Sequence, residues 1–523
     1  MKGYEQNVRK LEHILRTASY RRQTSMKKRA GIVGAGIGGL SAAALLAKAG
    51  WQVDVYDRLP YLGGKAGSRK LGAYRFDTGP SLFTMPWVFQ DFFSSLGERM
   101  EDRLRPIPLE PICKYFYHDG TRLSSYSDTS RFGKEIERTT HSTKDELEKY
   151  LRGSSGIWNV AGELFLKHSL HEPSTYLSKN GIRSILGLPV IDPFHTLHEA
   201  NTRAFADPRI VQLFDRYATY NGSSPYKTPA TMRIVPHVEY QWGGWSVEGG
   251  IVSVPRAIGA AAIAAGANIV LDTEVQRITT RDGMVSGLQV AGVYVPYDVV
   301  VSNADVLSTW RNLLDQSEAP EAQAYERLEP SSSGLVFLWG IKRSFPELIT
   351  NNIFFSSDYR SEFSGIFGPE NSSSPFGEDP TIYINITSKT EPSDAPAAGE
   401  NWFVLINTPR NTGQDWATIA ARIKNVVLKR LSTELRTDVG ALIEEELIMT
   451  PADIERDTGS TYGSLYGIAS NDRMSSFMRH PNRSRRIQGL YLAGGSAHPG
   501  GGMPLALLSG TIAAQLALRH ENH

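Results

Sequence analysis

Three glycines near the N-terminus have the spacing of a phosphate-binding loop. Gly34, Gly36 and Gly39 form the pattern G-x-G-x-x-G within RAGIVGAGIGGLSAAALLAKAGWQVDVYD. The first glycine permits a tight turn, the second lets a diphosphate approach the backbone, and the third lets helix and strand pack closely. Asp57 follows at the distance where a carboxylate can accept hydrogen bonds from ribose hydroxyls. Together these residues predict a dinucleotide-binding site.

The same stretch contains the elements that such a loop needs. Gly31–Val33 end an apolar strand, Ser41–Ala49 form a helix of small residues closed by Gly50, and Val53 and Val55 alternate in a second strand. The start of that helix would present free amides and the positive end of its dipole to the diphosphate.

A second glycine pair distinguishes between the two common dinucleotides. Gly63 and Gly64 are followed by Lys65, and then by Asp77–Pro80 in DTGP. A nicotinamide-binding domain would continue to its next crossover helix. A second loop of close backbone approach favours a longer cofactor with a buried ring system, FAD, although a plain glycine turn before a hairpin remains the alternative.

Two later segments continue the nucleotide-binding fold. In Trp245–Asp305 a helix is expected over Pro255–Ala265, ending at Gly266. Strands are expected over Ala267–Leu271, Val275–Thr279, Val285–Val290 and Asp298–Ser302. In the tail, a strand over Gly489–Ala493 precedes the loop Gly494–Gly502.

A helix over Pro504–Leu518 follows that loop, and proline is tolerated in its first turn. Its dipole would favour the negative charge of a reduced flavin by about 0.3–2 kcal/mol. His498, the loop's one titratable group, is either a structural hydrogen-bonding residue or a contact of flavin or substrate.

Composition narrows the function further. A chain of 523 residues predicts two or three domains, and a net charge of +1 without a basic stripe argues against a nucleic-acid partner. The single cysteine, Cys113, excludes a disulfide framework, a cysteine metal cluster and a dithiol redox centre. No apolar run reaches the length of a membrane span. The N-terminus lacks the apolar core of a secretory signal, so it is either a disordered extension or lies before a true start at Met26. We expect a cytoplasmic protein.

Together, the motifs resemble the bacterial phytoene desaturase-type family of carotenoid desaturases and isomerases, over essentially the whole chain from Met26. The matching stretches are GIVGAGIGGL, the Gly63–Pro80 pair of motifs, VEGG, TEV, SNAD and MRHPNRSRRIQGLYLAGGSAHPGGGMPL. The resemblance implies an α/β fold, in which a Rossmann-like FAD-binding domain is interleaved with a mixed-sheet substrate domain and a helical membrane-contact region. The implied parts are an N-terminal extension (1–27), FAD segments (28–94, 245–305 and 480–523), a substrate and helical membrane-contact region (95–244) and a substrate domain (306–479).

The resemblance also implies the cofactor contacts. Two departures from the family pattern are Asp57, where glutamate is commoner, and Lys65, where arginine is commoner and could grip phosphate with two hydrogen bonds. The residues expected to bind FAD are Gly34, Ala35, Gly36, Gly39, Asp57, Gly64, Lys65, Val275, Gly494 and Met503.

The implied activity is FAD-dependent desaturation of a carotenoid. GGGMPLALLSG and YGSLYGIASN look more like the 1-hydroxycarotenoid 3,4-desaturase branch than the phytoene-desaturating branch. Phytoene desaturation or isomerisation is the alternative, followed by a flavin amine oxidase or a non-catalytic prenyl-lipid-binding escort protein. The electron acceptor would be oxygen or a quinone.

Desaturation of a polyene does not demand a strong protein base, because the cation left by hydride departure is delocalised. Asp145, Glu146, Glu239 and His498 are candidate acid–base groups, although each fits a surface or structural role as well, and no metal site is expected. The apolar stretch Tyr176–Ala200 is the candidate for contact with a membrane surface, and core of the helical region is its alternative.

Overall fold

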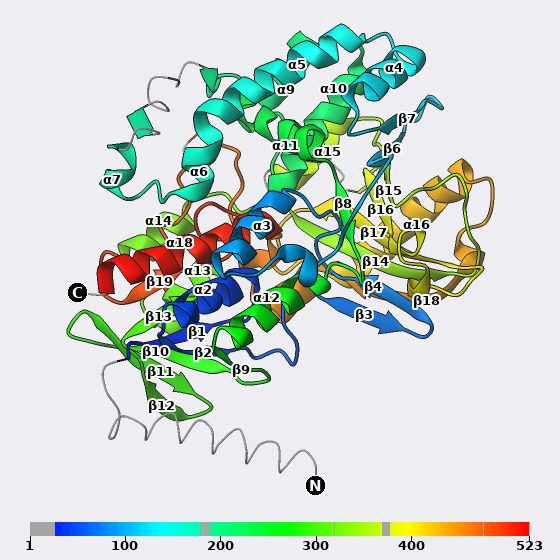
Figure 1. Ribbon diagram of the computed structural model, residues 1–523. Helices are drawn as coiled ribbons and strands as arrows, with labels where there is room; N and C mark the ends of the chain where they lie inside the picture. The colour runs from blue at the N-terminus through cyan, green and yellow to red at the C-terminus, as the bar shows by residue number, and fades with distance from the viewer. Residues whose placement is uncertain are drawn as a thin grey trace.

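The structure is a computed structural model that describes residues 27–177, 181–182, 187, 190–317, 319–368, 377–473 and 475–521. Almost all of the predicted N-terminal extension, and part of the predicted membrane-contact stretch, lie outside these residues. In Figure 1 the parallel sheet and its helices lie below, a large mixed sheet lies to the right, and a layer of helices lies above. Within the described residues, no helix is both long enough and apolar enough to span a bilayer.

A five-stranded parallel sheet, in the order β19-β13-β1-β2-β9, collects strands from three distant parts of the chain. Its interior strands are apolar and buried because helices cover the sheet. The predicted Rossmann-like α/β fold is confirmed. The strands are β1 (Arg29–Val33), β2 (Gln52–Tyr56), β9 (Asn268–Val270), β13 (Val299–Ser302) and β19 (Leu490–Leu492).

The sequence-based boundaries differ from the structure mainly at helix starts. Helix α2 begins at Ile37 and not at Ser41, because the chain turns at Gly34 and Gly36 and the next two glycines already form its first turn. A hairpin strand, β12, was not predicted, and it completes a small antiparallel sheet. That sheet contains β10 (Val275–Arg281), β11 (Met284–Val290) and β12 (Val293–Pro296).

Three helices pack on the parallel sheet: α2 (Ile37–Lys48), α12 (Ser253–Ala264) and α18 (Met503–Glu521). Helices α2 and α18 approach so closely that a Cβ atom on Gly510 would lie 1.9 Å from the carbonyl oxygen of Gly38. The hydroxyl of Ser41 donates within its own helix and to Leu507 O, each at 3.0 Å. This contact packs the start of α2 against the first two turns of α18, and the two helices lie side by side in Figure 1.

A seven-stranded mixed sheet forms the second body, in the order β18-β14-β17-β16-β15-β6-β7. All of its pairs are antiparallel except β15 with β6. Helix α16 (Trp416–Glu434) packs its buried residues on one face. The strands are β6 (Cys113–Phe116), β7 (Arg122–Ser125), β14 (Ser333–Ile341), β15 (Asn351–Phe354), β16 (Ile382–Ile386), β17 (Glu400–Thr408) and β18 (Ile443–Met449).

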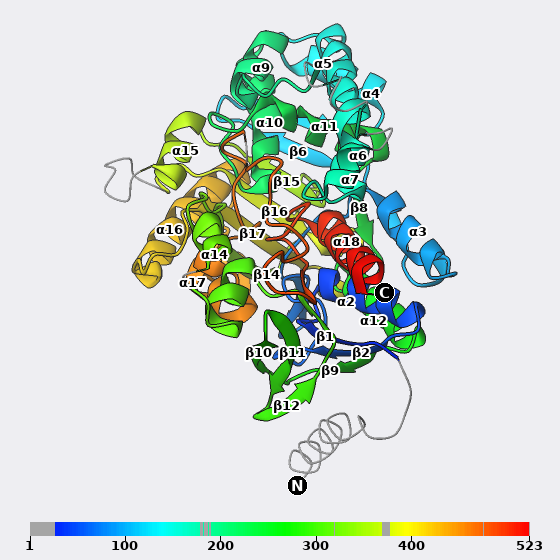
Figure 2. The same cartoon turned by 90° about the vertical axis from the view of Figure 1, so that its left-hand side faces the viewer.

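A layer of helices lies above these two bodies, as Figure 2 shows from the side. Its helices are α4 (Thr129–Thr139), α5 (Lys144–Ile157), α6 (Glu163–Lys167), α7 (Pro173–Tyr176), α9 (Leu197–Ala204), α10 (Pro208–Asp215) and α11 (Ile234–Trp242), with the 3-10 segment η5 (Arg216–Asn221). Smaller elements connect the bodies: β3 (Ser68–Leu71), β4 (Tyr74–Asp77), α3 (Pro86–Ser95), β5 (Pro106–Pro108), β8 (Trp245–Val247), α13 (Val306–Ser308), α14 (Pro320–Glu326), α15 (Tyr359–Phe367) and α17 (Pro451–Thr458).

The contact between α2 and α18 gives a testable prediction. Gly510→Ala forces a methyl group against the Gly38 carbonyl, so we expect a loss of about 1–3 kcal/mol or more in stability. We also expect weaker flavin retention, because both helix starts move. Gly153→Ala in α5 is the control: its Cβ would meet no atom closer than 3.8 Å, so stability should stay level or rise. Thermal unfolding of both variants measures the difference, and equal melting temperatures would contradict the prediction.

Candidate active site

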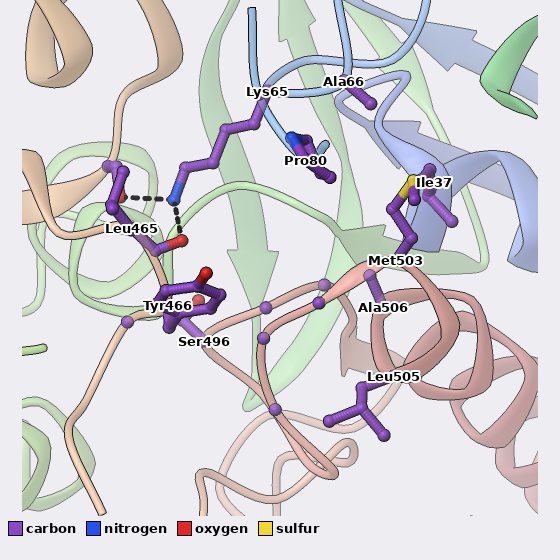
Figure 3. A pocket seen from close by; sticks show the side chains of 18 of the residues that line it. Ile37, Lys65, Ala66, Pro80, Leu465, Tyr466, Ser496, Met503, Leu505 and Ala506 are labelled. Atoms are coloured by element: carbon purple, nitrogen blue, oxygen red, sulfur yellow. Dashed lines mark hydrogen bonds between the residues drawn. The ribbon is translucent and has the colours of Figure 1, made fainter. Parts of the chain in front are cut away.

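A cavity of about 950 Å³ lies where the parallel sheet, the mixed sheet and the helical layer meet. Its first part is lined by the loops after β1, β2 and β13 and by the tail loop before α18. Its second part is lined by side chains of the mixed sheet and of the helical layer. Figure 3 shows the junction of the two parts, where Lys65, Tyr466 and Met503 come from three distant segments of the chain.

The glycine loop after β1 leaves the backbone open to this cavity. Gly34 has a φ of +94°, a conformation that favours glycine, and a Cβ on Gly39 would lie 2.1 Å from Gly34 O. Gly36, Ile37 and Gly38 line the cavity at the start of α2. The amides of this first turn have no partner within the helix, so they are suited to bind an anion such as a diphosphate.

Asp57, at the end of β2, is held in place by two backbone amides. Its Oδ2 accepts a hydrogen bond from Ala35 N at 2.7 Å, and its Oδ1 accepts one from Leu59 N at 2.8 Å. Burial raises the pKa of this carboxyl. Each oxygen keeps acceptor capacity for a ribose hydroxyl, and Asp57 lines the cavity. Ala35 therefore contributes by orienting Asp57.

Asn303 was missed as a site residue, although it stands in the quoted SNAD stretch directly after β13. Its side chain lies over the glycine loop: a Cβ on Gly36 would be 2.6 Å from Asn303 Nδ2, and one on Gly494 would be 2.8 Å from Oδ1. Oδ1 is buried and has no hydrogen-bond partner within the described residues. The carboxamide therefore explains why side chains are excluded from both loops, and it leaves an acceptor beside the predicted diphosphate position.

The Lys65 side chain extends along the cavity to the loop before Tyr466 and donates hydrogen bonds to it (Figure 3). Its Nζ donates to Ser460 Oγ, Ser464 O and Leu465 O, each at 2.9 Å. All three ammonium hydrogens are used, so Lys65 can act on a flavin through its charge and through this loop. Burial lowers the pKa of Lys65 to about 8, while the nearby Asp305 opposes that shift.

The tail loop lines the cavity beside the glycine loop, since a Cβ on Gly38 would lie 2.8 Å from Gly494 N. Gly500 and Gly502 have φ values of +131° and +105°, and a Cβ on Gly501 would lie 2.9 Å from atoms of Tyr466. Met503 and the following turn of α18 also line the cavity. The loop therefore offers backbone and a second helix N-terminus to the same space as α2.

The remaining predicted FAD contacts divide into two groups. Gly64, Val275 and Gly494 line the cavity, whereas Gly39 supports the glycine loop from behind. Their roles toward FAD stay predictions.

The candidate acid–base groups lie in different surroundings. The His498 side chain is fully buried, its Nε2 lies 2.9 Å from His168 O, and it is absent from the cavity lining. Burial lowers the pKa of His498 to about 3, so its placement favours the structural role. Asp145 and Glu146 form the first turn of α5, where Glu146 closes a capping box with Thr143. Glu239 alone of these groups lines the cavity.

The second part of the cavity is largely apolar. Phe403, Leu405 and Val336 come from the mixed sheet, and Trp158 and Phe165 come from the helical layer. An apolar lining of this kind is suited to a long hydrocarbon chain. Within the described residues, no cluster of three or more histidine, cysteine or acidic side chains is arranged to hold a metal ion.

Comparison with known proteins agrees with this geometry. Residues 37–518 match the family model of flavin-containing amine oxidoreductases. The chain belongs to this family. It is 42% identical to a 1-hydroxycarotenoid 3,4-desaturase of Flavobacterium sp. (strain P99-3), over 94% of this chain and 99% of that protein. It is also 33% identical to a 4,4'-diapolycopene oxygenase of Methylomonas sp., over 92% and 96% of the two chains.

These matches identify an FAD-dependent oxidoreductase of the carotenoid desaturase group. Solved structures show the shared fold. An oxidoreductase from Methanosarcina mazei matches with a TM-score of 0.62 at 16% identity, over 93% of this chain and all of that one. Cyclohexylamine oxidase from Brevibacterium oxydans matches with a TM-score of 0.59 at 14% identity, over 95% of this chain and all of that one. The glycine loop, Asp57 and the two helix N-termini fit the diphosphate, ribose and ring system of FAD.

The lowered pKa of Lys65 predicts a pH-dependent stability. In the folded protein this pKa is about 8, below its ordinary value of 10.5, so the unfolded chain binds more protons between these values. The contribution of Lys65 to stability should therefore rise with pH across that window, by at most about 1.4 kcal/mol per unit. We expect the stability of flavin-free wild type relative to Lys65→Met to increase from pH 8 to 10. Lys65→Arg, which keeps its charge, should show no such trend. If the stability difference between wild type and Lys65→Met does not change from pH 8 to 10, the lowered pKa of Lys65 is contradicted.

Proposed function

We propose that the protein catalyses 3,4-desaturation of a 1-hydroxylated carotenoid, with FAD as the hydride acceptor. The observation that carries this proposal is a cavity that runs from a wall of bare backbone into an apolar chamber, in a chain 42% identical to such a desaturase. A flavin lying on that wall would face the chamber directly.

The reaction removes a hydride from one carbon and a proton from its neighbour, and the two carbons become doubly bonded. FAD, when bound, supplies the acceptor for the hydride. The chain's own residues would hold the polyene against the ring and exclude water, which is the work expected of Phe403, Leu405 and Trp158. The positive end of α18 would favour the charge of the reduced ring. Reoxidation would use oxygen or a quinone.

The decisive experiment supplies the purified, flavin-loaded protein with a 1-hydroxylated acyclic carotenoid in lipid vesicles. We expect a product with one more conjugated double bond, which absorbs at longer wavelength and is two hydrogens lighter by mass spectrometry. Parallel reactions with oxygen, or with a quinone under anaerobic conditions, identify the acceptor. Conversion of colourless phytoene, or turnover of an amine in place of a carotenoid, would replace the proposal with one of its alternatives.

We further propose that the protein takes its substrate from a membrane surface through the helical layer. Eight large apolar side chains are exposed in the described chain, and five of them fall in the predicted membrane-contact stretch. Leu177 is 81% exposed and Phe194 is 72% exposed. The guanidinium of Arg473 lies 4.6 Å from the centre of the Phe194 ring, which places a cation where anionic headgroups would be. The five residues are Tyr176, Leu177, Ile182, Val190 and Phe194.

Vesicle binding tests this surface. The double variant Leu177→Ser with Phe194→Ser removes the two most exposed apolar groups, so we expect binding to anionic vesicles to fall at least tenfold. The matched control is Met284→Ser with Tyr294→Ser, which removes two exposed apolar groups from the small antiparallel sheet. Sedimentation with vesicles of phosphatidylcholine and phosphatidylglycerol measures both. Equal losses in the two double variants would show that this patch has no special role.

A further inference from the structure

One part of the substrate chamber is polar, although the rest of its lining is largely apolar. The 3-10 segment η5 brings Arg216, Thr219, Tyr220 and Asn221 to the cavity, and Glu239 reaches it from α11. A polyene has no polar atom along its chain, so these groups have no partner in the middle of such a substrate. They would be useful only to a substrate with a polar end.

Tyr220 is held by a buried network. Its hydroxyl donates to Glu239 Oε2, while Tyr217 donates to Glu239 Oε1 at 2.7 Å. Arg216 lies beside them. Its Nη2 donates to the Tyr115 hydroxyl at 3.0 Å, and the same atom lies 3.8 Å from Glu239 Oε1. Tyr220 donates its hydrogen to Glu239, and its oxygen accepts only one long hydrogen bond, from Arg216 Nη1 at 3.5 Å. Because Tyr220 lines the cavity, this oxygen can also accept from a ligand.

Burying this charge pair has a cost that local contacts do not fully offset. Arg216 is only 8% exposed and Glu239 only 1%, and Arg216 Nε has no hydrogen-bond partner within the described residues. Incomplete pairing of a buried guanidinium is unfavourable, so a network of this kind is expected where it serves a ligand.

Asn221 adds a second polar group next to Tyr220. Within the described residues its side-chain amide makes one hydrogen-bond contact, from Nδ2 to the sulfur of Met232 at 3.9 Å, and sulfur is a weak acceptor. The side chain is half-buried and lines the cavity. Asn221 therefore offers an amide donor, and Tyr220 an acceptor, from consecutive residues that both line the cavity. A hydroxyl group, which both accepts and donates, matches this pair.

The position of η5 suits the reaction. The next residue, Gly222, has a φ of +56°, and a Cβ there would lie 3.0 Å from the ring of Tyr466. Tyr466 in turn packs on Gly501 of the tail loop. In a 1-hydroxylated carotenoid, carbon 1 bears the hydroxyl, and only carbon 2 lies between it and the new 3,4 double bond. A group that binds this hydroxyl must therefore lie close to the flavin-facing wall, as η5 does.

We propose that Tyr220 and Asn221 bind the carbon-1 hydroxyl of the substrate and so select hydroxylated carotenoids, an inference that rests on the proposed function. The Asn221 amide donates to the hydroxyl oxygen, and the hydroxyl hydrogen is donated to the Tyr220 oxygen. Arg216 and Glu239 are positioning residues that fix Tyr220. The reacting bond is thereby placed at a set distance from the bound end group.

The test compares two substrates: a 1-hydroxylated acyclic carotenoid, and the same carotenoid without its hydroxyl. Wild type, Tyr220→Phe and Asn221→Leu are assayed as flavin-loaded proteins in vesicles. The control is Tyr226→Phe, which removes a hydroxyl from the same helical layer but outside the cavity lining. Flavin content by absorption confirms that each variant is folded. Binding of both carotenoids is followed separately, by quenching of tryptophan fluorescence.

We expect Asn221→Leu and Tyr220→Phe to lower kcat/KM for the hydroxylated substrate roughly 10- to 100-fold. The value for the other carotenoid should change less than threefold, and binding should follow the same pattern. Tyr226→Phe should behave as wild type. If Asn221→Leu lowers both substrates equally, or changes neither, the inference is overturned while the proposed function stands. If wild type leaves the hydroxylated carotenoid unchanged, the proposed function itself fails.

Discussion

The contact between α2 and α18 is the constraint on which the site depends. These helices lie at opposite ends of the chain, yet the absence of side chains at Gly38 and Gly510 lets their backbones meet. Ser41 then bridges them by donating to Leu507 O. As a result, two helix N-termini open into one cavity, so the positive ends of two dipoles would act on the same bound cofactor. A larger residue at either glycine would separate the glycine loop from the tail loop.

The parts of this site that were predictable from sequence are those that depend on the backbone conformation of a single short segment. Gly34 was expected in a tight turn and has a φ of +94°, and Asp57 follows its strand at a recognisable distance. The parallel sheet was predictable for the same reason, because its apolar strands are bounded by glycines. Helix starts were misplaced where glycines belong to the first turn, as at Gly38 in α2.

The residues that were missed depend on contacts between distant segments. Asn303 matters because it lies between the glycine loop and the tail loop. Tyr466 matters because it packs on Gly501 from a separate segment of the chain. Tyr220 looks like an ordinary aromatic residue until Glu239 is placed beside it. His498 is a different case: the sequence left open whether it is a structural residue or a contact of flavin or substrate, and its placement 2.9 Å from His168 O favours the structural role.

The distribution of polarity in the cavity also bears on how a membrane-borne substrate is handled. A volume of about 950 Å³ is at the upper end of the roughly 300–1,000 Å³ typical of pockets for one small ligand, and a bound FAD would take up part of it. A 3,4 bond lies near the end of a carotenoid, so only that end has to leave the bilayer. Binding a hydroxyl at Tyr220 and Asn221 would offset the loss of its hydration. The rest of the polyene would stay in contact with lipid beside Leu177 and Phe194, where apolar surface already faces outward. Binding of the polar end inside the cavity would therefore determine which end of the substrate enters, and selectivity for the end group would also determine which bond meets the flavin.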